Sequence, residues 1–168
     1  SFLVDAFPGS KVRGIGALES AVIVFKDKSV QSVTGDIAQD SFRVDELSYG
    51  GIGAVSHHSI KRIKDTLFFM SSKGVFAVNL EGLQDVGKNI SPEFTKFTVP
   101  YTLQKSTAVN WVNRDKYVIF CPSISTDGSS NKYADSHSMT FAYDYEQNAW
   151  VKWDTINACG GLVLLGND

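Results

Sequence analysis

The sequence predicts an all-β fold of antiparallel strands, and two observations carry this prediction. Short runs of β-branched and aromatic residues alternate with turn clusters rich in Gly, Asp, Asn, Ser and Lys, whereas helical periodicity is nearly absent. Similar segments also recur, with an offset of 45 residues from Val22 to Leu67 and 51 from Leu67 to Val118. Repeats of this size are typical of the four-stranded blades of a β-propeller. An antiparallel β-sandwich is the alternative, because regular strand spacing also suits it.

The predicted strands fall into three groups, each separated internally by short polar turns. In chain order they are 20–25, 29–34 and 41–47; then 59–63, 66–70, 75–79 and an edge at 83–86; then 108–112, 116–121, 139–143 and 149–153. A further group begins at Gly161. We therefore interpret residues 1–168 as a single propeller domain, partial or four-bladed, or as a propeller fragment of a longer chain. Its repeats cover about 12–50, 51–98 and 106–156, with a partial repeat at 157–168.

Two stretches interrupt the strands. Ser91 precedes Pro92 and Glu93, a pattern that predicts one helical turn near 91–97, because Ser caps a helix and Pro suits its first position. The segment from Pro122 to Ser138 is rich in Ser, Asp and Asn and predicts a long surface loop. Loops of that length are uncommon without a function.

Composition indicates one globular domain with a sizeable core. The chain has 168 residues, 43% of them hydrophobic, and a net charge of −2. This balance argues against specific binding of nucleic acid, which usually needs a basic face. The apolar runs at 21–25 and 162–165 are far shorter than the roughly 20 residues of a membrane-spanning helix. We expect Cys121 and Cys159 to be free, buried thiols, because two cysteines form no disulfide framework.

The polar residues do not form a recognisable catalytic or metal-binding pattern. His57 and His58 are adjacent, and in an extended segment their side chains would point to opposite faces. His137 has no ligand-spaced carboxylate or thiol nearby, and no serine lies in a nucleophile elbow. We therefore predict no catalytic residues, no cofactor-binding residues and no metal ligands, and the protein is interpreted as a non-enzyme without a cofactor.

Weaker motifs also favour structural roles. The stretch 125–128 starts like an aspartate box but lacks its Trp, and a calcium loop of Asp127, Asn131 and Asp135 would lack the terminal Glu of an EF-hand. The glycines of 14–16 and 50–53 are interpreted as bends that link strands where backbones pass closely. The three tryptophans, Trp111, Trp150 and Trp153, favour core packing over a carbohydrate platform. Trp150 and Trp153 should lie on opposite faces of one strand.

Several sequence segments resemble those of a known family and occur in the same order. These segments are AVIVFKDKSVQSVTGD, FRVDELSYGGIGAVSHHSIKRIKDTLFFMSSKGVFAVN, VGKNISPEF, KYVIFCPS and FAYDYEQNAWVKWD. In this order they are similar to the propeller domain of bacteriophage tail tubular or nozzle proteins and of related packaged-DNA stabilisation proteins. The resemblance covers most of 15–154 and rests on structural elements such as the turn at Lys73-Gly74 and the hairpin from Asp144 to Trp150.

The resemblance implies a virion structural protein. It would be one subunit of a tail nozzle or connector ring that retains packaged DNA and conducts it during DNA ejection. The implied partners are further copies of the chain in a homo-oligomeric ring and other tail or portal proteins, with no membrane. The implied location is the phage tail, assembled in the host cytoplasm. The alternative function is a propeller module that binds a host receptor or glycan through its loops, with 122–138 as the contact.

Overall fold

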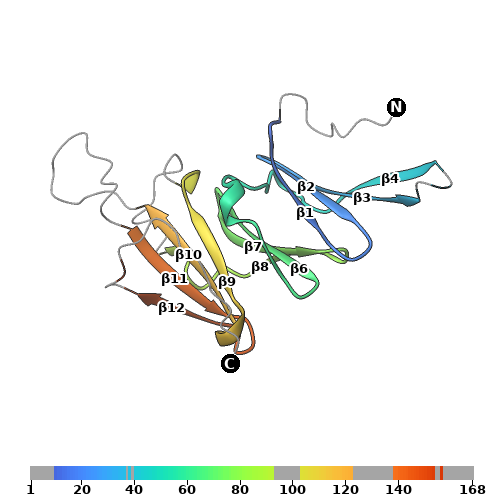
Figure 1. The fold of residues 1–168 in the computed structure, drawn as a ribbon. Coiled ribbons are helices and arrows are strands. Elements are labelled where there is room, and N and C mark those ends of the chain that lie inside the picture. Colours follow the sequence, from blue (N-terminus) through green and yellow to red (C-terminus); the bar gives the residue numbers. More distant parts are fainter. Residues whose placement is uncertain are drawn as a thin grey trace.

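The computed structural model describes residues 10–36, 38, 40–92, 103–122, 138–153 and 156. These residues form three antiparallel four-stranded sheets, which follow one another across the molecule in chain order (Figure 1). The predicted all-β class is therefore confirmed. Apart from short 3-10 turns, only Ser91, Pro92 and Leu103 have a helical conformation among the described residues. The remainder of the helical turn predicted at 91–97 lies outside the described residues.

Each sheet is a meander in which consecutive strands are neighbours. The first sheet contains β1 (Val12–Ala17), β2 (Val22–Lys26), β3 (Val30–Asp36) and β4 (Ser41–Glu46). The second contains β5 (Lys61–Ile63), β6 (Thr66–Ser71), β7 (Gly74–Asn79) and β8 (Gly82–Asp85), preceded by the 3-10 turn η2 (His57–Ser59). The third contains β9 (Thr107–Trp111), β10 (Lys116–Pro122), β11 (Ser138–Asp144) and β12 (Ala149–Trp153), with η3 (Val112–Arg114) after β9.

Short turns produce these meanders because their residues accept positive φ angles. Lys64, Asp115 and Asn148 have φ values of 53°, 52° and 53°, and Gly74 has a φ of 132°. Asn and Asp tolerate the left-handed region better than most residues, and Gly enters it without steric cost. The turn residues therefore set where each strand reverses. Strands β2 to β12 all match predicted strands to within two residues at each end.

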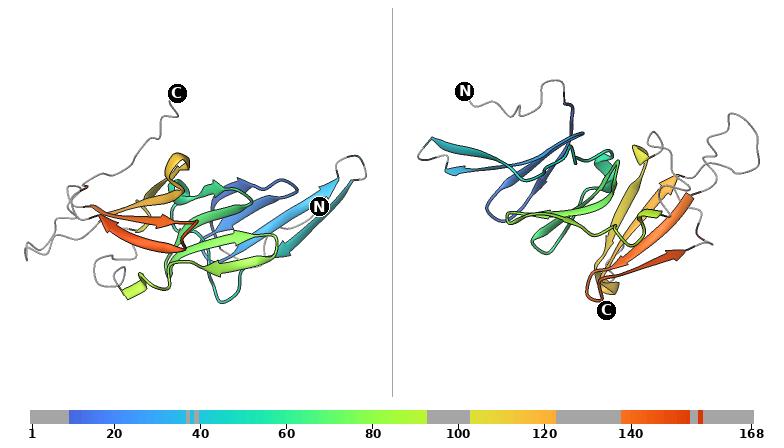
Figure 2. Two further views of the ribbon diagram at one scale, coloured as in Figure 1. Left: turned by 90° about the horizontal axis from the view of Figure 1, so that it is seen from below. Right: turned by 180° about the vertical axis from the view of Figure 1, so that it is seen from behind.

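The second sheet is packed between the other two, and we name the sheet faces accordingly (Figure 2). The preceding face of a sheet points toward the earlier sheet in the chain, and the following face points toward the later one. In the first sheet the preceding face is therefore the one turned away from the second sheet, and in the third sheet the following face is the one turned away from the second sheet. Ile23, Phe25 and Val30 on the following face of the first sheet pack with the preceding face of the second, which carries Leu67, Phe69, Phe76 and Val78.

A second core joins the second and third sheets. The following face of the second sheet contributes Phe68, Met70, Val75 and Ala77, and the preceding face of the third contributes Tyr117, Ile119, Cys121, Phe141 and Tyr143. The first strands of the three sheets lie along one side of this stack, because β1 contacts β5 and β5 contacts β9. Successive sheets therefore meet both through their faces and through their first strands.

The interpretation of 14–16 as a bend is wrong, because these residues lie inside β1. A Cβ on Gly16 would lie 2.6 Å from Leu67 Cδ1, and one on Gly14 would lie 2.6 Å from Ile60 Cδ1. The glycines thus let β1 approach the second sheet closely, which was the correct part of the prediction. In 50–53 the bend is confirmed by the φ values of 70° and 73° at Gly50 and Gly51, whereas the close approach of backbones occurs at Gly53 alone, where a Cβ would lie 2.2 Å from the carbonyl oxygen of Lys26.

The predicted repeat alignment is shifted by one residue in the third sheet. Leu67 lies on the preceding face of the second sheet, whereas Val118 lies on the following face of the third. The residues of β10 that share the orientation of Leu67 are Tyr117 and Ile119. A one-residue slip moves a side chain to the opposite face of a sheet, which explains the discrepancy. The strand predicted at 59–63 also starts later, at Lys61, because Ser59 belongs to η2.

Candidate functional site

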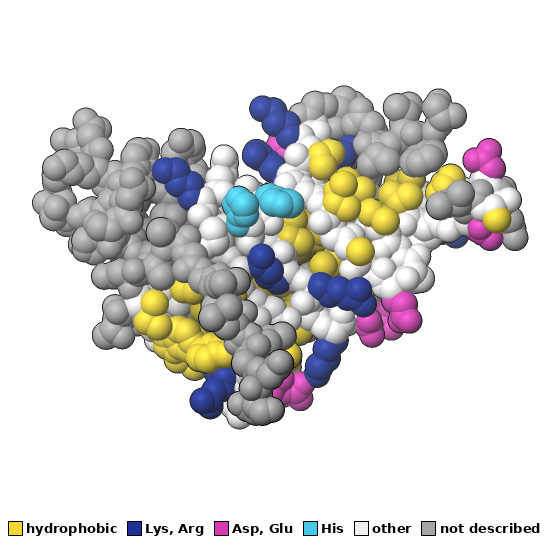
Figure 3. Space-filling view, in the orientation of Figure 1, with side chains coloured by type: hydrophobic (Ala, Val, Ile, Leu, Met, Phe, Trp, Pro, Cys, Tyr) yellow, Lys and Arg dark blue, Asp and Glu magenta, His cyan; other side chains and the backbone are white. Residues whose placement is uncertain are grey.

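The preceding face of the first sheet is largely apolar and partly open to solvent, with one polar pair, Gln31 and Glu46, on β3 and β4. Val22, Val33 and Val44 pair in sequence across β2, β3 and β4, and Ile15 pairs with Val24 beside them. Ile15 is 63% exposed and Val22 43% exposed, and the other three are partly exposed. Figure 3 shows hydrophobic side chains gathered over the first sheet. Because contiguous exposed apolar patches mark interaction sites, this face is the candidate functional surface.

The following face of the third sheet is the other terminal face of the stack. Val118, Phe120 and Ala142 are buried there, and Trp111 and Trp153 pack against them with ring centroids 6.3 Å apart. The side chain of Val151 lies on the same face, because Val151 pairs with Ala142, and it is 50% exposed. This face is therefore apolar and rich in aromatic residues, with an accessible rim on β12.

Tryptophan packing follows the prediction. Trp150 belongs to the core between the second and third sheets, and Trp153 lies on the opposite face of β12. The indole Nε1 of Trp150 donates a hydrogen bond to the carbonyl oxygen of Val86 at 2.7 Å. Trp150 therefore links β12 to the segment after β8.

Two hydrogen bonds, one buried and one exposed, join the third sheet to the second sheet and the turn before it. The Tyr117 hydroxyl donates to the carbonyl oxygen of Ser59 at 2.8 Å, and the Asn110 amide nitrogen donates to that of Arg62 at 3.0 Å. Burial raises the pKa of Tyr117 well above its ordinary value. The phenol is thus a neutral hydrogen-bond donor, as a structural tyrosine in a core requires.

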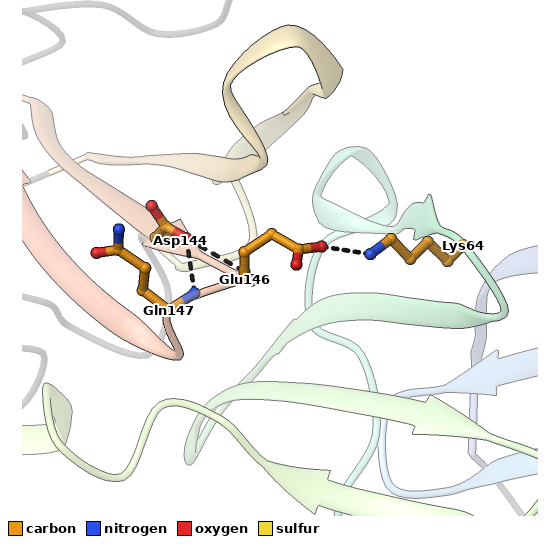
Figure 4. A network of polar contacts seen from close by, with 4 residues as sticks. All are labelled: Lys64, Asp144, Glu146 and Gln147. Carbon is orange, nitrogen blue, oxygen red and sulfur yellow. Dashed lines mark hydrogen bonds and ion pairs between the residues drawn. The ribbon is translucent and has the colours of Figure 1, made fainter.

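A polar cluster joins the same two sheets at the surface (Figure 4). Lys64, in the turn before β6, pairs with Glu146 in the turn after β11. Asp144 accepts hydrogen bonds from the backbone N–H groups of Glu146 and Gln147 at 3.1 and 2.9 Å. The Lys116 ammonium also bonds to Asp144 at 2.7 Å, and this hydrogen bond lowers the pKa of that carboxyl. All these groups are used in turn formation or ion pairing, so the cluster is structural.

The histidine pair is arranged differently from the prediction. His57 and His58 lie in the 3-10 turn η2 rather than in an extended segment, and their rings are 5.4 Å apart in an edge-on arrangement. The argument that they point to opposite faces is therefore wrong. Within the described part of the chain, no group of three His, Cys, Asp or Glu side chains is placed to hold a metal ion.

The polar motifs of the long loop lie outside the described residues. This applies to the aspartate-box-like stretch 125–128, to the calcium candidates Asp127, Asn131 and Asp135, and to His137. Cys159 and the partial repeat 157–168 also lie outside them. These predictions therefore stay predictions.

A shallow groove runs between the first and second sheets near β4 and β8. It encloses about 520 Å³ and is lined in part by Leu47, Tyr49, Ile52 and Leu83. Glu81 is the single carboxylate among its described lining residues. General acid–base catalysis and glycoside hydrolysis need partnered groups across a cleft. An adjoining hollow shares Tyr49 and Glu81 with the groove and is also lined by Asp45 and Glu46.

Cys121 is a free thiol buried in the core between the second and third sheets, as predicted. Burial raises its pKa from 9.0 to about 12, and a hydrogen bond with Ser106 offsets this effect only in part. A thiol with such a pKa is protonated at neutral pH and is a poor nucleophile. Cys121 thus contributes to packing.

Comparisons with models of protein families and with curated proteins find no match to this chain. No helix in the described residues has the length and apolar character needed to cross a membrane.

The feature that sequence reasoning missed is the apolar preceding face of the first sheet. Its signal was the alternation of apolar residues through Ile15, Val22 and Val24, but β1 was not expected.

Proposed function

We propose that the three sheets are blades of a β-propeller. Each blade of a propeller is a four-stranded antiparallel meander, and its first strand lies nearest the central axis. The meander topology of all three sheets supports this arrangement, as do the contacts of β1 with β5 and of β5 with β9. Face-to-face packing of consecutive sheets supports it as well.

The proposed function is that of a virion structural protein, a subunit of a bacteriophage tail nozzle or connector ring. The observation that carries this proposal is the exposed, largely apolar preceding face of the first sheet, which includes Ile15 on the edge strand β1 and Val22 on β2. A contiguous apolar sheet face suits assembly with another protein surface, whereas the described residues offer no catalytic group arrangement. The resemblance of the sequence segments and their order to tail tubular or nozzle proteins then favours a phage tail as the assembly.

The charge of the chain suits a conduit for DNA. A ring that retains DNA and later releases it needs weak attraction for phosphate groups, because each neutralised phosphate strengthens binding. The chain carries 16 basic and 18 acidic residues, and several of its cations are paired with carboxylates, as in Lys64–Glu146 and Lys116–Asp144. The proposed partners are copies of the chain and other tail or portal proteins.

Immunogold electron microscopy tests this function. Antibodies are raised against the recombinant chain. They are then applied to particles of the phage whose genome encodes this sequence. Label at the tail below the portal is expected from a ring subunit. Label at the distal ends of fibres, together with loss of adsorption after deletion of 123–137, would instead establish the receptor-binding alternative. Particles with complete tails and no label would overturn both.

A further inference from the structure

Strand β4 is the last strand of the first sheet, and among the described strands its one hydrogen-bonded neighbour is β3. The hairpin of β3 and β4 projects away from the second sheet, as Figure 1 and Figure 2 show. An edge strand presents a row of backbone N–H and C=O groups that can pair with a strand of another chain. The free edge of β4 is therefore a candidate contact surface.

The ladder between β3 and β4 determines which backbone groups face this edge. The Leu47 N–H donates to the Val30 carbonyl oxygen at 2.9 Å, and the pairs of β4 with β3 continue the same register. In an antiparallel ladder, pairs that exchange hydrogen bonds alternate with pairs whose backbone groups point outward. Every second residue of β4 therefore points its N–H and C=O groups toward the free edge. These residues are Phe42, Val44 and Glu46.

The side chains of β4 are complementary to the same strand running in the opposite direction. Arg43 and Asp45 lie on the following face of the sheet, on either side of Val44, and their side chains are 77% and 40% exposed. If two copies of β4 pair about Val44, Arg43 of each chain lies opposite Asp45 of the other. Phe42 then lies opposite Glu46, so the residues that face the edge meet one another.

Charge also selects this register over its neighbours. Shifts of two residues are the smallest that keep the edge-facing backbone groups opposite each other. A shift in one direction places Arg43 opposite Arg43, and a shift in the other places Asp45 opposite Asp45. Like charges directly opposite each other are destabilising. The last strands of the other two sheets, β8 and β12, each contain a single charged residue, so neither has this complementarity.

We propose that the free edge of β4 pairs in antiparallel orientation with β4 of a second copy of this chain, with the two-fold axis at Val44. The two first sheets then form one continuous sheet. The Arg43 guanidinium uses its Nε toward Asp45 of its own chain at 2.8 Å, and its other N–H groups are available to Asp45 of the second copy. A two-fold contact closes after two copies. The inference therefore goes beyond the proposed function, because it describes how the free chain pairs and not the contact that extends a ring.

Sedimentation equilibrium of the 168-residue chain measures this association. One pair of short edge strands is a small interface, so we expect a dissociation constant of about 30 µM and mostly dimer at about 300 µM. Arg43→Glu places a glutamate opposite Asp45, and Asp45→Arg places an arginine opposite Arg43. Each should weaken association at least tenfold, because both cross-strand pairs become repulsive. Arg62→Glu is the matched control and should leave the dimer intact, since Arg62 is an exposed arginine that also pairs with an aspartate but lies on β5.

Mixing the two charge variants tests the register. In a mixed pair, the new glutamate of one chain lies opposite the new arginine of the other, and the native Arg43 lies opposite the native Asp45. Mixing Arg43→Glu with Asp45→Arg in equal amounts should therefore restore association to nearly wild-type strength, although each variant alone is weakened. A monomeric wild type, a dimer that both variants leave unchanged, or a mixture that does not recover overturns the proposal.

Hydrogen exchange of the wild type, followed by NMR, examines the same edge without any substitution and so does not depend on the folding of a variant. The amide protons of Phe42, Val44 and Glu46 should exchange about threefold more slowly at about 500 µM than at about 30 µM, because only the monomer exposes them. Equal rates at both concentrations overturn the proposal.

The result is separable from the proposed function. A monomeric chain combined with immunogold label below the portal contradicts only this inference, whereas a dimer without label on particles contradicts only the tail assignment.

Discussion

Cys121 should make the folded protein sensitive to alkaline pH. The thiol is fully buried among Met139, Tyr117 and Ile119 of the third sheet and other members of the core shared with the second sheet. Its folded-state pKa is about 12, against an ordinary value of 9.0. Because the unfolded chain loses this proton first as pH rises, the stabilising effect is complete below pH 9 and is lost progressively between pH 9 and pH 12.

The magnitude follows from proton linkage. Above the unfolded pKa, each pH unit removes about 1.4 kcal/mol of unfolding free energy until the folded pKa is reached. The loss from Cys121 is therefore about 1 kcal/mol at pH 10 and about 3 kcal/mol at pH 11. Small domains have roughly 5–15 kcal/mol of stability, so this loss is readily measurable. Cys121→Ala removes the ionisable group and should remove this pH dependence, at a constant cost from the lost packing.

Urea unfolding followed by circular dichroism at pH 7, 9, 10 and 11 provides the assay. Cys159→Ala serves as the reference chain in which Cys121 is the single thiol, and the double variant Cys159→Ala/Cys121→Ala is compared with it. Ionisation of the other tyrosines is common to both chains, whereas the pKa of Tyr117 is raised in part by Cys121, so the difference between the two curves reports the thiol together with its coupling to Tyr117. Parallel curves from pH 7 to pH 11 would refute the reasoning, because they would show that the buried thiolate carries no penalty.

Three further predictions concern the contacts between sheets. Tyr117→Phe removes the donor to a buried carbonyl of η2 and should lower the free energy of unfolding by about 1–3 kcal/mol in urea denaturation at pH 7; an unchanged midpoint would contradict a role for this bond. Gly53→Ala should cost upwards of about 2 kcal/mol in the same assay, because the new Cβ would overlap the carbonyl oxygen of Lys26, and near-wild-type stability would show that the backbone yields there. Lys64→Ala should leave the midpoint of thermal unfolding nearly unchanged, since its ion pair with Glu146 is exposed, and a clear drop of the midpoint would contradict this.

Most strands could be predicted because their ends carry strong turn chemistry. Lys64-Asp65 and Asn148 separate apolar runs at positions where the structure has left-handed turn residues. Strand β1 escaped prediction because Gly14 and Gly16 resemble bend residues in the sequence. Their actual role is to leave space for Ile60, which precedes β5, and for Leu67 of β6, and such a requirement is set by tertiary packing rather than by local pattern.

The orientation of strands was harder to predict than their location. Residues 117–121 of β10 are apolar at every position, so the sequence contains no alternation that distinguishes the preceding face from the following one. The candidate surface was missed for a related reason. Val22 and Leu67 look equivalent in sequence, and only the neighbouring sheet makes one exposed and the other buried.

The order of the sheets along the chain has a consequence for synthesis on the ribosome. The first sheet uses only residues 12–46, so all its hydrogen-bond partners have been translated before β5 is made. Hairpins form in microseconds, whereas about 5–20 residues are translated each second, so every sheet has time to form as it emerges. Translation thereby delivers the sheets singly and in the order in which they pack, and the risk of pairing strands from different repeats is reduced.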